Sequence, residues 1–258
     1  MTDSCKAIRK RMLEISAKGR DGNLQSCFSS VEIIYALYDR VLDLTPEKFE
    51  RPHDRFFLSK GQANLTLLTV LSEKGLLPRE ELEGFCRFDS RIAMQADRTK
   101  FGGLLENSAG SLGHGFPMAV GYAWAAKIKK TGERVFVLAG DGEMNEGTMW
   151  EAALFASSEG LKDLTLIVDD NGSIGRMLSF GDLAAKLGAF GFDVETVDGH
   201  SVDELATAMK KTGDRPRAII AKTVRGYGSR TLTEDRSWFH RCPTETALAE
   251  LKREVDAF

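Results

Sequence analysis

Short apolar runs alternate with helical segments through the second half of the chain, and this alternation constrains the fold more than any other feature. Four runs rich in β-branched and aliphatic residues predict strands, at 134–138, 164–168, 193–197 and 217–221. Segments with the apolar spacing of helices accompany them, at 118–129, 148–158, 182–187 and 202–210. Repeated strand, helix, strand units fold with right-handed crossovers. The sequence therefore predicts an α/β fold with a parallel sheet covered by helices on both faces.

The first third of the chain has a different pattern, because helical spacing recurs there without an intervening strand signal. The expected helices are 5–17, 30–41 and 62–73, and a further helix is expected near the end at 244–255. A polar, glycine-rich stretch at 89–115 is long for a connecting loop, so it is a candidate functional segment.

We expect one domain over residues 1–258. Its helical third, 1–88, is predicted to pack on an α/β core formed by 110–258.

The composition excludes several classes of function. The 35 basic and 38 acidic side chains give a net charge of -3, which argues against a nucleic-acid surface because such a surface needs a basic stripe. No apolar run is long enough to cross a membrane, and no apolar segment follows the basic N-terminus, so a cytoplasmic protein is expected. The 4 cysteines form no C-x-x-C pair, which argues against a metal knuckle or a redox pair.

A Gly-Asp-Gly sequence, with Asp141 at its centre, closely follows the predicted strand 134–138. Ligands of open parallel sheets bind beyond the carboxyl ends of the strands, and glycines let backbone amides approach a phosphate. Ordinary turns also contain this tripeptide. However, Asn171 closely follows the next predicted strand, 164–168, so two neighbouring strands bring oxygen ligands to one edge. These two side chains, a backbone carbonyl just after Asn171 and two phosphate oxygens would suit Mg²⁺.

This pattern, a Gly-Asp-Gly followed after the next strand by an asparagine, is the thiamine diphosphate signature, and its surroundings resemble transketolase. The similar segments follow the family's order along nearly the whole chain, at 57–61, 108–115, 140–147 with 150–153, 197–200 and 221–224.

The resemblance implies a site for thiamine diphosphate and a divalent cation, either Mg²⁺ or, in its place, Ca²⁺ or Mn²⁺. The cofactor-binding residues that it implies are Gly110, Ser111, Leu112, Gly113, Gly140, Asp141, Gly142, Glu143, Glu146 and Asn171. The metal ligands that it implies are Asp141, Asn171 and the carbonyl of Ser173, with Ile174 as the alternative carbonyl.

The length carries a further implication of this resemblance. Full transketolases have three domains, whereas this chain of 258 residues resembles the first domain alone. A separate C-terminal transketolase-like subunit would then supply the pyrimidine-binding domain and the glutamate that protonates the aminopyrimidine. We expect an α2β2 heterotetramer that is active only when both subunits are present. Glu146 matches a residue at the subunit contact of the family; alternatively it is an exposed carboxylate at a helix start.

Three positions depart from the family, because amides stand where transketolases usually have histidines: Asn23, Gln62 and Gln95. An amide keeps a hydrogen bond but cannot titrate near neutrality. His240 and His114 are the histidines expected near the site, so these five residues are the candidate catalytic set. The loss of imidazoles predicts a donor or acceptor other than the usual sugar phosphates, such as a modified sugar or another small carbonyl compound.

The reaction implied by the family is transfer of a two-carbon ketol unit from a ketone donor to a carbonyl acceptor. Two alternatives stay open. One is the α subunit of a 2-oxo-acid dehydrogenase, although the order of the segments 59–61, 110–113 and 198–200 favours transketolase. The other is a catalytically retired subunit that regulates an active partner, although the intact Asp141 and Asn171 argue against it.

Overall fold

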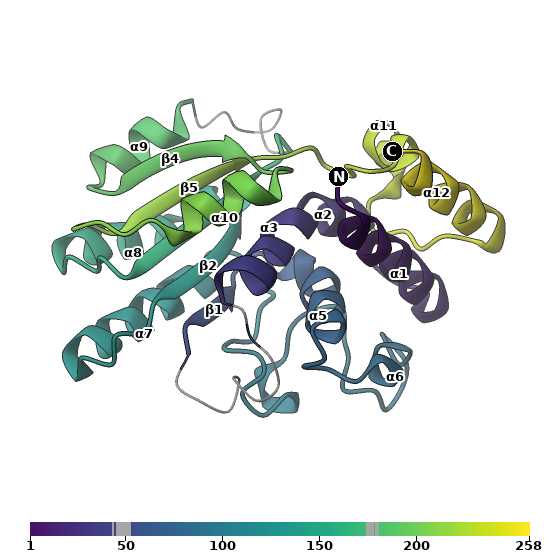
Figure 1. Cartoon of the computed structure of the whole chain (residues 1–258), viewed down its shortest axis with the longest axis horizontal. Helices are drawn as coiled ribbons and strands as arrows, with labels where there is room; N and C mark the ends of the chain where they lie inside the picture. Colours follow the sequence, from purple (N-terminus) through teal and green to yellow (C-terminus); the bar gives the residue numbers. More distant parts are fainter. Residues whose placement is uncertain (43, 45–52, 174–177, 179–180) are drawn as a thin grey trace.

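The two strands that precede the candidate metal ligands lie beside each other in a five-stranded parallel sheet. The computed structural model describes residues 1–42, 44, 53–173, 178 and 181–258. The strand order is β1-β2-β3-β5-β4, and every neighbouring pair is parallel (Figure 1). The strands are β1 (Arg55–Leu58), β2 (Val135–Gly140), β3 (Leu164–Asp170), β4 (Asp193–Asp198) and β5 (Arg217–Lys222).

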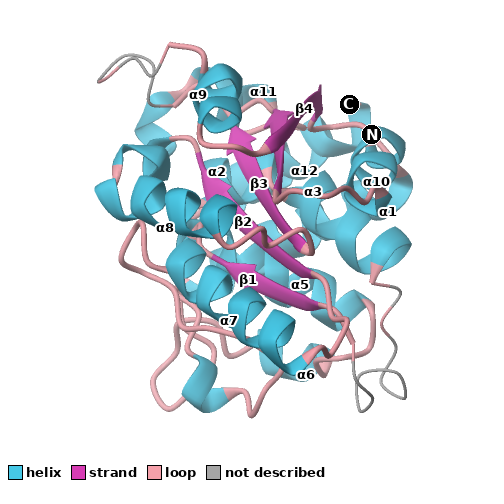
Figure 2. Cartoon of the chain, turned by 90° about the vertical axis from the view of Figure 1, so that its left-hand side faces the viewer, coloured by secondary structure: helices cyan, strands magenta, loops and turns pink. Residues whose placement is uncertain are grey.

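Helices cover both faces of this sheet, as Figure 2 shows. Along β2, Val135 and Val137 pack into one apolar cluster with α7 (Gly115–Lys129), α8 (Gly147–Ser158) and α9 (Leu183–Ala189). The intervening Phe136 and Leu138 point into a second cluster, which contains α1 (Asp3–Gly19), α3 (Val31–Ala36), α5 (Asn64–Glu73) and α10 (Val202–Lys210). Strands that are buried on both faces belong to parallel sheets with helical layers on each side. The predicted fold class is therefore confirmed.

Several short helical pieces and the C-terminal helix complete the described part of the chain. The remaining elements are α2 (Leu24–Ser29), a π-helix (Leu37–Val41), 3₁₀ turns at Gly61–Ala63, Arg98–Lys100, Gly142–Asn145 and Arg236–Trp238, α6 (Arg79–Leu82), α11 (Arg230–Glu234) and α12 (Glu245–Ala257). The expected helix 30–41 thus divides into α3 and the π-helix.

The expectation that the first third is all-helical is wrong, because β1 lies within it. This strand has four residues and pairs with β2, where Leu58 lies opposite Leu138. A run this short has too few residues to show a strand period, and its pairing with a distant segment stabilises it. β1 matters for the site because Ser59 and Lys60 follow its carboxyl end.

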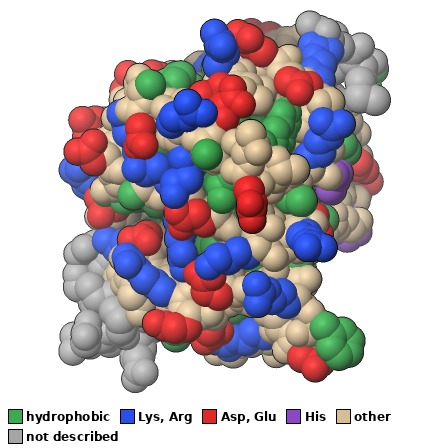
Figure 3. Space-filling view, turned by 90° about the vertical axis from the view of Figure 1, so that its right-hand side faces the viewer, with side chains coloured by type: hydrophobic (Ala, Val, Ile, Leu, Met, Phe, Trp, Pro, Cys, Tyr) green, Lys and Arg blue, Asp and Glu red, His purple; other side chains and the backbone are tan. Residues whose placement is uncertain are grey.

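The two ends of the chain meet, since α12 packs on α1 (Figure 1). Lys10 and Asp256 form an ion pair of 2.6 Å between these helices, and Lys252 pairs with Glu14 at 2.6 Å. The face in Figure 3 shows basic and acidic side chains interspersed, without a field of one sign. No helix among the described residues is long and apolar enough to span a membrane.

One apolar cluster joins the helices of the first third to strands β2, β3 and β5. The prediction of one domain over residues 1–258, with 1–88 packed on a core of 110–258, stays a prediction, apart from the strand β1 that residues 1–88 add to the sheet.

Candidate functional site

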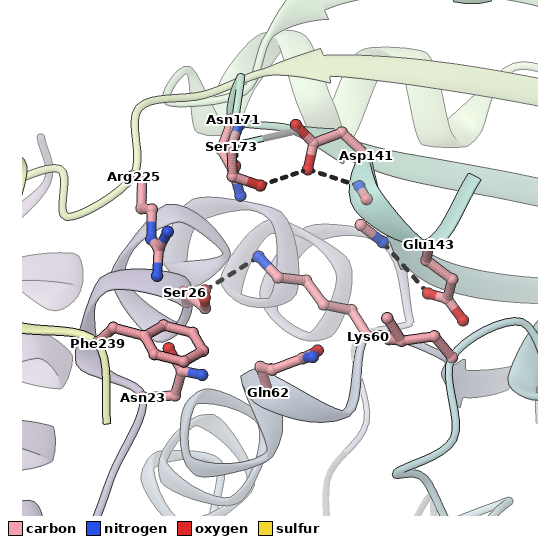
Figure 4. A pocket seen from close by; sticks show the side chains of 13 residues that line it. Asn23, Ser26, Lys60, Gln62, Asp141, Glu143, Asn171, Ser173, Arg225 and Phe239 are labelled. Atoms are coloured by element: carbon pink, nitrogen blue, oxygen red, sulfur yellow. Dashed lines mark hydrogen bonds between the residues drawn. The ribbon is translucent and has the colours of Figure 1, made fainter. Parts of the chain in front are cut away.

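A polar pocket opens at the carboxyl edge of the sheet, where β2 and β3 end (Figure 4). Gly140 lies opposite Asp169 in the register of these strands, so Asp141 and Asn171 follow at the same edge. The pocket has a volume of about 150 Å³. Segments far apart in the sequence line it: Asn23, Ser26, Lys60, Gln62, Leu112, Gly140, Asp141, Gly142, Glu143, Asn171, Ser173, Arg225 and Phe239.

Asp141 is held at one side of the pocket with most of its surface buried. Its Oδ1 accepts a hydrogen bond from the backbone amide of Gly142 at 2.8 Å and another from Ser173 Oγ at 2.9 Å. Asn171 Oδ1 in turn accepts from the backbone amide of Ser173 at 3.0 Å. Figure 4 shows these side chains grouped together. The structure therefore brings together all three predicted metal-ligand residues; Ile174 lies outside the described residues.

The donors in this group fit a hard divalent cation bound beside a phosphate. A carboxylate, an amide oxygen and a hydroxyl or carbonyl oxygen are ligands that Mg²⁺ prefers. No cluster of three His, Cys, Asp or Glu side chains suited to a metal occurs among the described residues. Mg²⁺ that bridges a carboxylate and phosphates takes part of its coordination from the bound ligand.

Lys60 crosses the floor of the pocket and is anchored by a buried ion pair. Its Nζ lies 2.5 Å from Asp169 Oδ2 and donates to the carbonyl of Ser26 at 3.0 Å. The hydroxyls of Ser29 and Ser30 also contact this carboxylate, at 2.8 and 2.7 Å. Burial alone would raise the pKa of Asp169, but Lys60 and the hydroxyls of Thr223 and Ser30 hold it below its usual range. The ion pair between Lys60 and Asp169 therefore links the end of β1 to β3 beneath the pocket.

Glu143 ties the glycine-rich loop to the strand ends. Its carboxylate accepts hydrogen bonds from the backbone amide of Gly113 at 2.8 Å, from Gly140 at 3.3 Å and from Ser59 Oγ. Burial raises the pKa of Glu143, and these bonds only partly oppose it. A Cβ on Gly115 would lie 2.5 Å from Ser59 Cα, so the loop packs against the end of β1. Glu143 is therefore placed to hold the shape of the pocket.

The three predicted amides differ in position. Asn23 and Gln62 line the pocket, whereas Gln95 packs beside Gly61, outside the lining. The side-chain oxygens of Asn23 and Gln95 are buried and have no hydrogen-bond partner within the described structure. Asn23 thus presents an unsatisfied acceptor at the pocket, and such an atom favours a ligand with a donor group.

Several other predicted residues lie next to the lining rather than in it. These are Gly110, Ser111, Gly113, His114, Glu146 and His240, whereas Leu112 does line the pocket. His114 Nδ1 lies 3.1 Å from the carbonyl of Leu112. His240 is exposed, has a left-handed backbone with φ of 53°, and packs edge to face on Phe239. The functional roles of all these residues stay predictions.

Sequence reasoning does not select Ser26, Lys60, Arg225 or Phe239 as site residues, yet all four line the pocket. For Lys60 a signal exists, since Ser59-Lys60-Gly61 is one of the segments similar to transketolase and follows a strand. For Ser26, Arg225 and Phe239 no local pattern distinguishes them from surface residues. His200 has a structural role, since its Nδ1 lies 3.1 Å from the buried carboxylate of Glu32.

Comparison with known proteins decides the family. Residues 2–255 match the profile of the family described as "Transketolase, thiamine diphosphate binding domain". The chain belongs to the transketolase family. The pocket wall of aspartate, asparagine and glycine thus lies in a domain type that binds thiamine diphosphate, and the enzymes of this family are thiamine diphosphate-dependent transferases.

This transketolase-family chain is similar to three proteins that differ in length. It is 31% identical over 256 residues to a subunit of the apulose-4-phosphate transketolase of Phocaeicola vulgatus, covering 96% of this chain and 90% of the relative. It is 32% identical to a 6-deoxy-6-sulfo-D-fructose transketolase subunit of a Clostridium species, covering 96% of this chain and 94% of the relative. The solved transketolase of Leishmania mexicana superimposes with a TM-score of 0.87 at 26% identity over 98% of this chain. The chain spans 40% of the length of that transketolase.

Proposed function

We propose that the chain is the diphosphate-binding and magnesium-binding subunit of a two-component transketolase. The observation that carries this proposal is the placement of Asp141 and Asn171, which follow neighbouring strands and meet at one polar pocket. The family of the chain and its length, 40% of a solved transketolase, add support. Relatives of similar length carry names that call them a subunit. The proposed reaction moves a two-carbon ketol unit from a ketone donor to a carbonyl acceptor.

The residues of this chain would bind and orient the reactants. Asp141, Asn171 and Ser173 would hold Mg²⁺ against the diphosphate, while the loop amides near Gly113 would be positioned by Glu143. Bound there, thiamine diphosphate supplies the electron sink for cleavage of a carbon–carbon bond beside a carbonyl. Asn23 and Gln62 would hydrogen-bond the hydroxyl or carbonyl oxygens of a sugar without transferring protons.

We propose that the substrate is a modified sugar or a related carbonyl compound. We also propose that the protein acts in the cytoplasm. Amides at positions 23, 62 and 95 support a non-standard substrate. The relatives named for apulose 4-phosphate and for 6-deoxy-6-sulfo-D-fructose support the same class. All four cysteines are free thiols, as a reducing compartment requires.

An assay of the assembled complex separates this proposal from its alternatives. We expect ketol transfer from a modified ketose to be at least ~10-fold faster, in kcat/KM, than transfer from xylulose 5-phosphate, because uncharged amides replace the imidazoles that assist proton transfer with the usual substrates. Fast transfer from xylulose 5-phosphate to ribose 5-phosphate would contradict the substrate class. Decarboxylation of a 2-oxo acid in place of ketol transfer would identify a 2-oxo-acid dehydrogenase subunit.

The partner subunit is expected on an apolar groove between α7 and α8. Trp124, Leu154 and Phe155 are 41%, 61% and 40% exposed on these helices, and Trp124 packs edge to face on Phe155. The groove has a volume of about 330 Å³. It adjoins the glycine-rich loop next to the site, because Thr148 in its wall donates a hydrogen bond to the carbonyl of Gly113 at 2.7 Å. Apolar surface of this kind marks interaction sites.

Leu154→Asp should weaken association with the partner subunit by at least ~30-fold, because it places a charge on the exposed apolar surface of α8 beside this groove. Analytical ultracentrifugation of the mixed subunits measures the affinity. Lys210→Asp introduces an acid on the opposite face of the sheet, on α10, and serves as the control. Equal association of the wild-type protein and Leu154→Asp would place the partner elsewhere.

A further inference from the structure

The turn that follows β4 packs against the end of β5 and presents His200 to the segment 224–228. The backbone amide of Gly199 donates to the carbonyl of Lys222 at 2.8 Å, and a Cβ on Gly199 would lie only 2.8 Å from the same carbonyl oxygen. Asp198 Oδ1 accepts from the backbone amide of His200 at 2.9 Å. The side chain of His200 therefore lies beside the segment that leaves β5, with 7% of its surface exposed.

The partners of the two ring nitrogens of His200 determine its tautomer. Nδ1 lies 3.1 Å from Glu32 Oε2, and Nε2 lies 2.8 Å from the backbone nitrogen of Val224. Burial alone would raise the pKa of Glu32, but Arg9 and His200 hold it below its usual range, so Glu32 is a charged acceptor. The proton of His200 therefore lies on Nδ1, and Nε2 accepts from the amide of Val224. A proton on Nε2 would set two N–H donors face to face.

The segment 224–228 needs anchors because two of its five residues are glycines. Gly226 and Gly228 have left-handed backbones, with φ of 81° and 99°, and glycine loses more conformational freedom on folding than any other residue. The ring of Tyr227 stacks on His200, with the ring centroids 3.5 Å apart. The imidazole of His200 thus holds the segment at two points.

The position of this backbone matters for the pocket because Arg225 belongs to the lining. Arg225 follows Val224 directly, so the hydrogen bond to His200 fixes the backbone on one side of it. The guanidinium of Arg225 lies over the ring of Phe239, at 5.5 Å from the ring centroid, and Phe239 also lines the pocket. Figure 4 shows these two side chains together on one side of the pocket. A shift of the Val224 amide would therefore move this wall.

We propose that His200 is a positioning residue of the pocket: its Nε2 holds Val224 and thereby places the wall that Arg225 and Phe239 form. The inference rests on the proposed function, which assigns the pocket to thiamine diphosphate and Mg²⁺. His200 lies outside the lining of the pocket, so it acts through the backbone that it holds. It does so in the neutral form that carries its proton on Nδ1.

Two variants of similar size separate the roles of the two nitrogens. His200→Gln keeps an acceptor close to the position of Nε2, whereas His200→Asn keeps a donor close to the position of Nδ1 and loses the acceptor for Val224. Both variants lose the stacking on Tyr227. We expect His200→Asn to weaken binding of thiamine diphosphate by the assembled complex, at saturating Mg²⁺, by ~10-fold, and His200→Gln to stay within ~3-fold of the wild-type value.

Equilibrium dialysis against labelled cofactor measures these affinities. Hydrogen–deuterium exchange, followed by mass spectrometry, should become faster at 222–228 in His200→Asn and should stay close to the wild-type rate in His200→Gln. Asp203→Asn is the control, because it removes an exposed carboxylate from the first turn of α10, near the same turn. This control should change neither the affinity nor the exchange.

Nitrogen NMR of the full chain with labelled histidine determines the tautomer without any substitution. The chain has 4 histidines, and the signal that disappears in His200→Asn is that of His200. We expect this residue to carry its proton on Nδ1 alone at neutral pH.

The inference is overturned if the proton lies on Nε2, if His200→Asn binds the cofactor as well as the wild-type protein does, or if His200→Gln loses as much affinity as His200→Asn. Failure of the proposed function looks different: the wild-type complex then does not bind thiamine diphosphate. In that case the tautomer and the exchange at 222–228 still decide whether His200 holds the segment.

Discussion

Asp141→Asn should reduce the affinity of the assembled complex for thiamine diphosphate and Mg²⁺ by more than ~100-fold. Loss of a residue that only hydrogen-bonds to a metal ligand typically costs ~10–100-fold in metal affinity, and loss of the ligand's own charge should cost more. The asparagine keeps the size of the side chain and the oxygen that accepts from Gly142 and Ser173, so the local fold should persist. It removes the negative charge that a divalent cation needs beside a diphosphate. Equilibrium dialysis against labelled cofactor, at several Mg²⁺ concentrations, measures the effect.

Asp170→Asn is the matched control for this prediction. Asp170 ends the neighbouring strand β3, pairs with the exposed Lys222 and lies outside the pocket lining. The Asp170→Asn substitution should keep the cofactor affinity within about 2-fold of the wild-type value, because surface substitutions usually change free energies by less than ~0.5 kcal/mol. If Asp141→Asn retained the cofactor as well as Asp170→Asn does, the metal site would not be at Asp141.

Lys60→Met should lower the free energy of unfolding at pH 7 by ~3–5 kcal/mol, the usual cost of removing one partner of a buried ion pair. The methionine fills much of the space of the lysine stem but leaves the carboxylate of Asp169 buried without its cation. Urea denaturation monitored by circular dichroism gives the free energy. The double variant Lys60→Met/Asp169→Asn should recover most of the loss, because the uncompensated charge is gone.

The pH dependence provides a second readout for this pair. The pKa of Asp169 lies below its usual range in the wild-type protein, so its stabilising contribution is present above pH ~4 and is lost as the pH falls through the lowered value. In Lys60→Met the dependence should reverse, since burial then raises the pKa of Asp169 and protonation on acidification relieves the unpaired charge.

Lys222→Met removes the cation of the exposed pair with Asp170 and should cost less than ~1 kcal/mol. Equal losses in Lys60→Met and Lys222→Met would show that the buried pair does not hold the pocket floor.

The central part of the site can be predicted because strand ends determine it. Once 134–138 and 164–168 are identified as neighbouring parallel strands, Asp141 and Asn171 must lie at the same edge. The two helical layers are equally predictable, since β2 places alternate apolar residues on opposite faces. These features depend on local patterns that a single sequence contains.

The rest of the site depends on contacts between distant segments. Lys60 reaches Asp169 across 109 positions, and the backbone beside Arg225 is fixed by Gln25 and His200. β1 could not be predicted from the sequence, because four residues are too few to show the apolar–polar alternation of a strand. The strand forms because it pairs with β2. The position of His240 could not be predicted either: this residue, with a φ of 53°, lies outside the lining, whereas its neighbour Phe239 belongs to the lining.

Cofactor binding by the two subunits, separately and together, tests the central claim most directly. We propose that this chain holds the diphosphate and Mg²⁺ while a second chain completes the site. A titration of thiamine diphosphate should therefore show tight binding only when both subunits and Mg²⁺ are present, with one cofactor for each copy of this chain. Binding that is independent of Mg²⁺, or no binding by the assembled complex, would contradict the account.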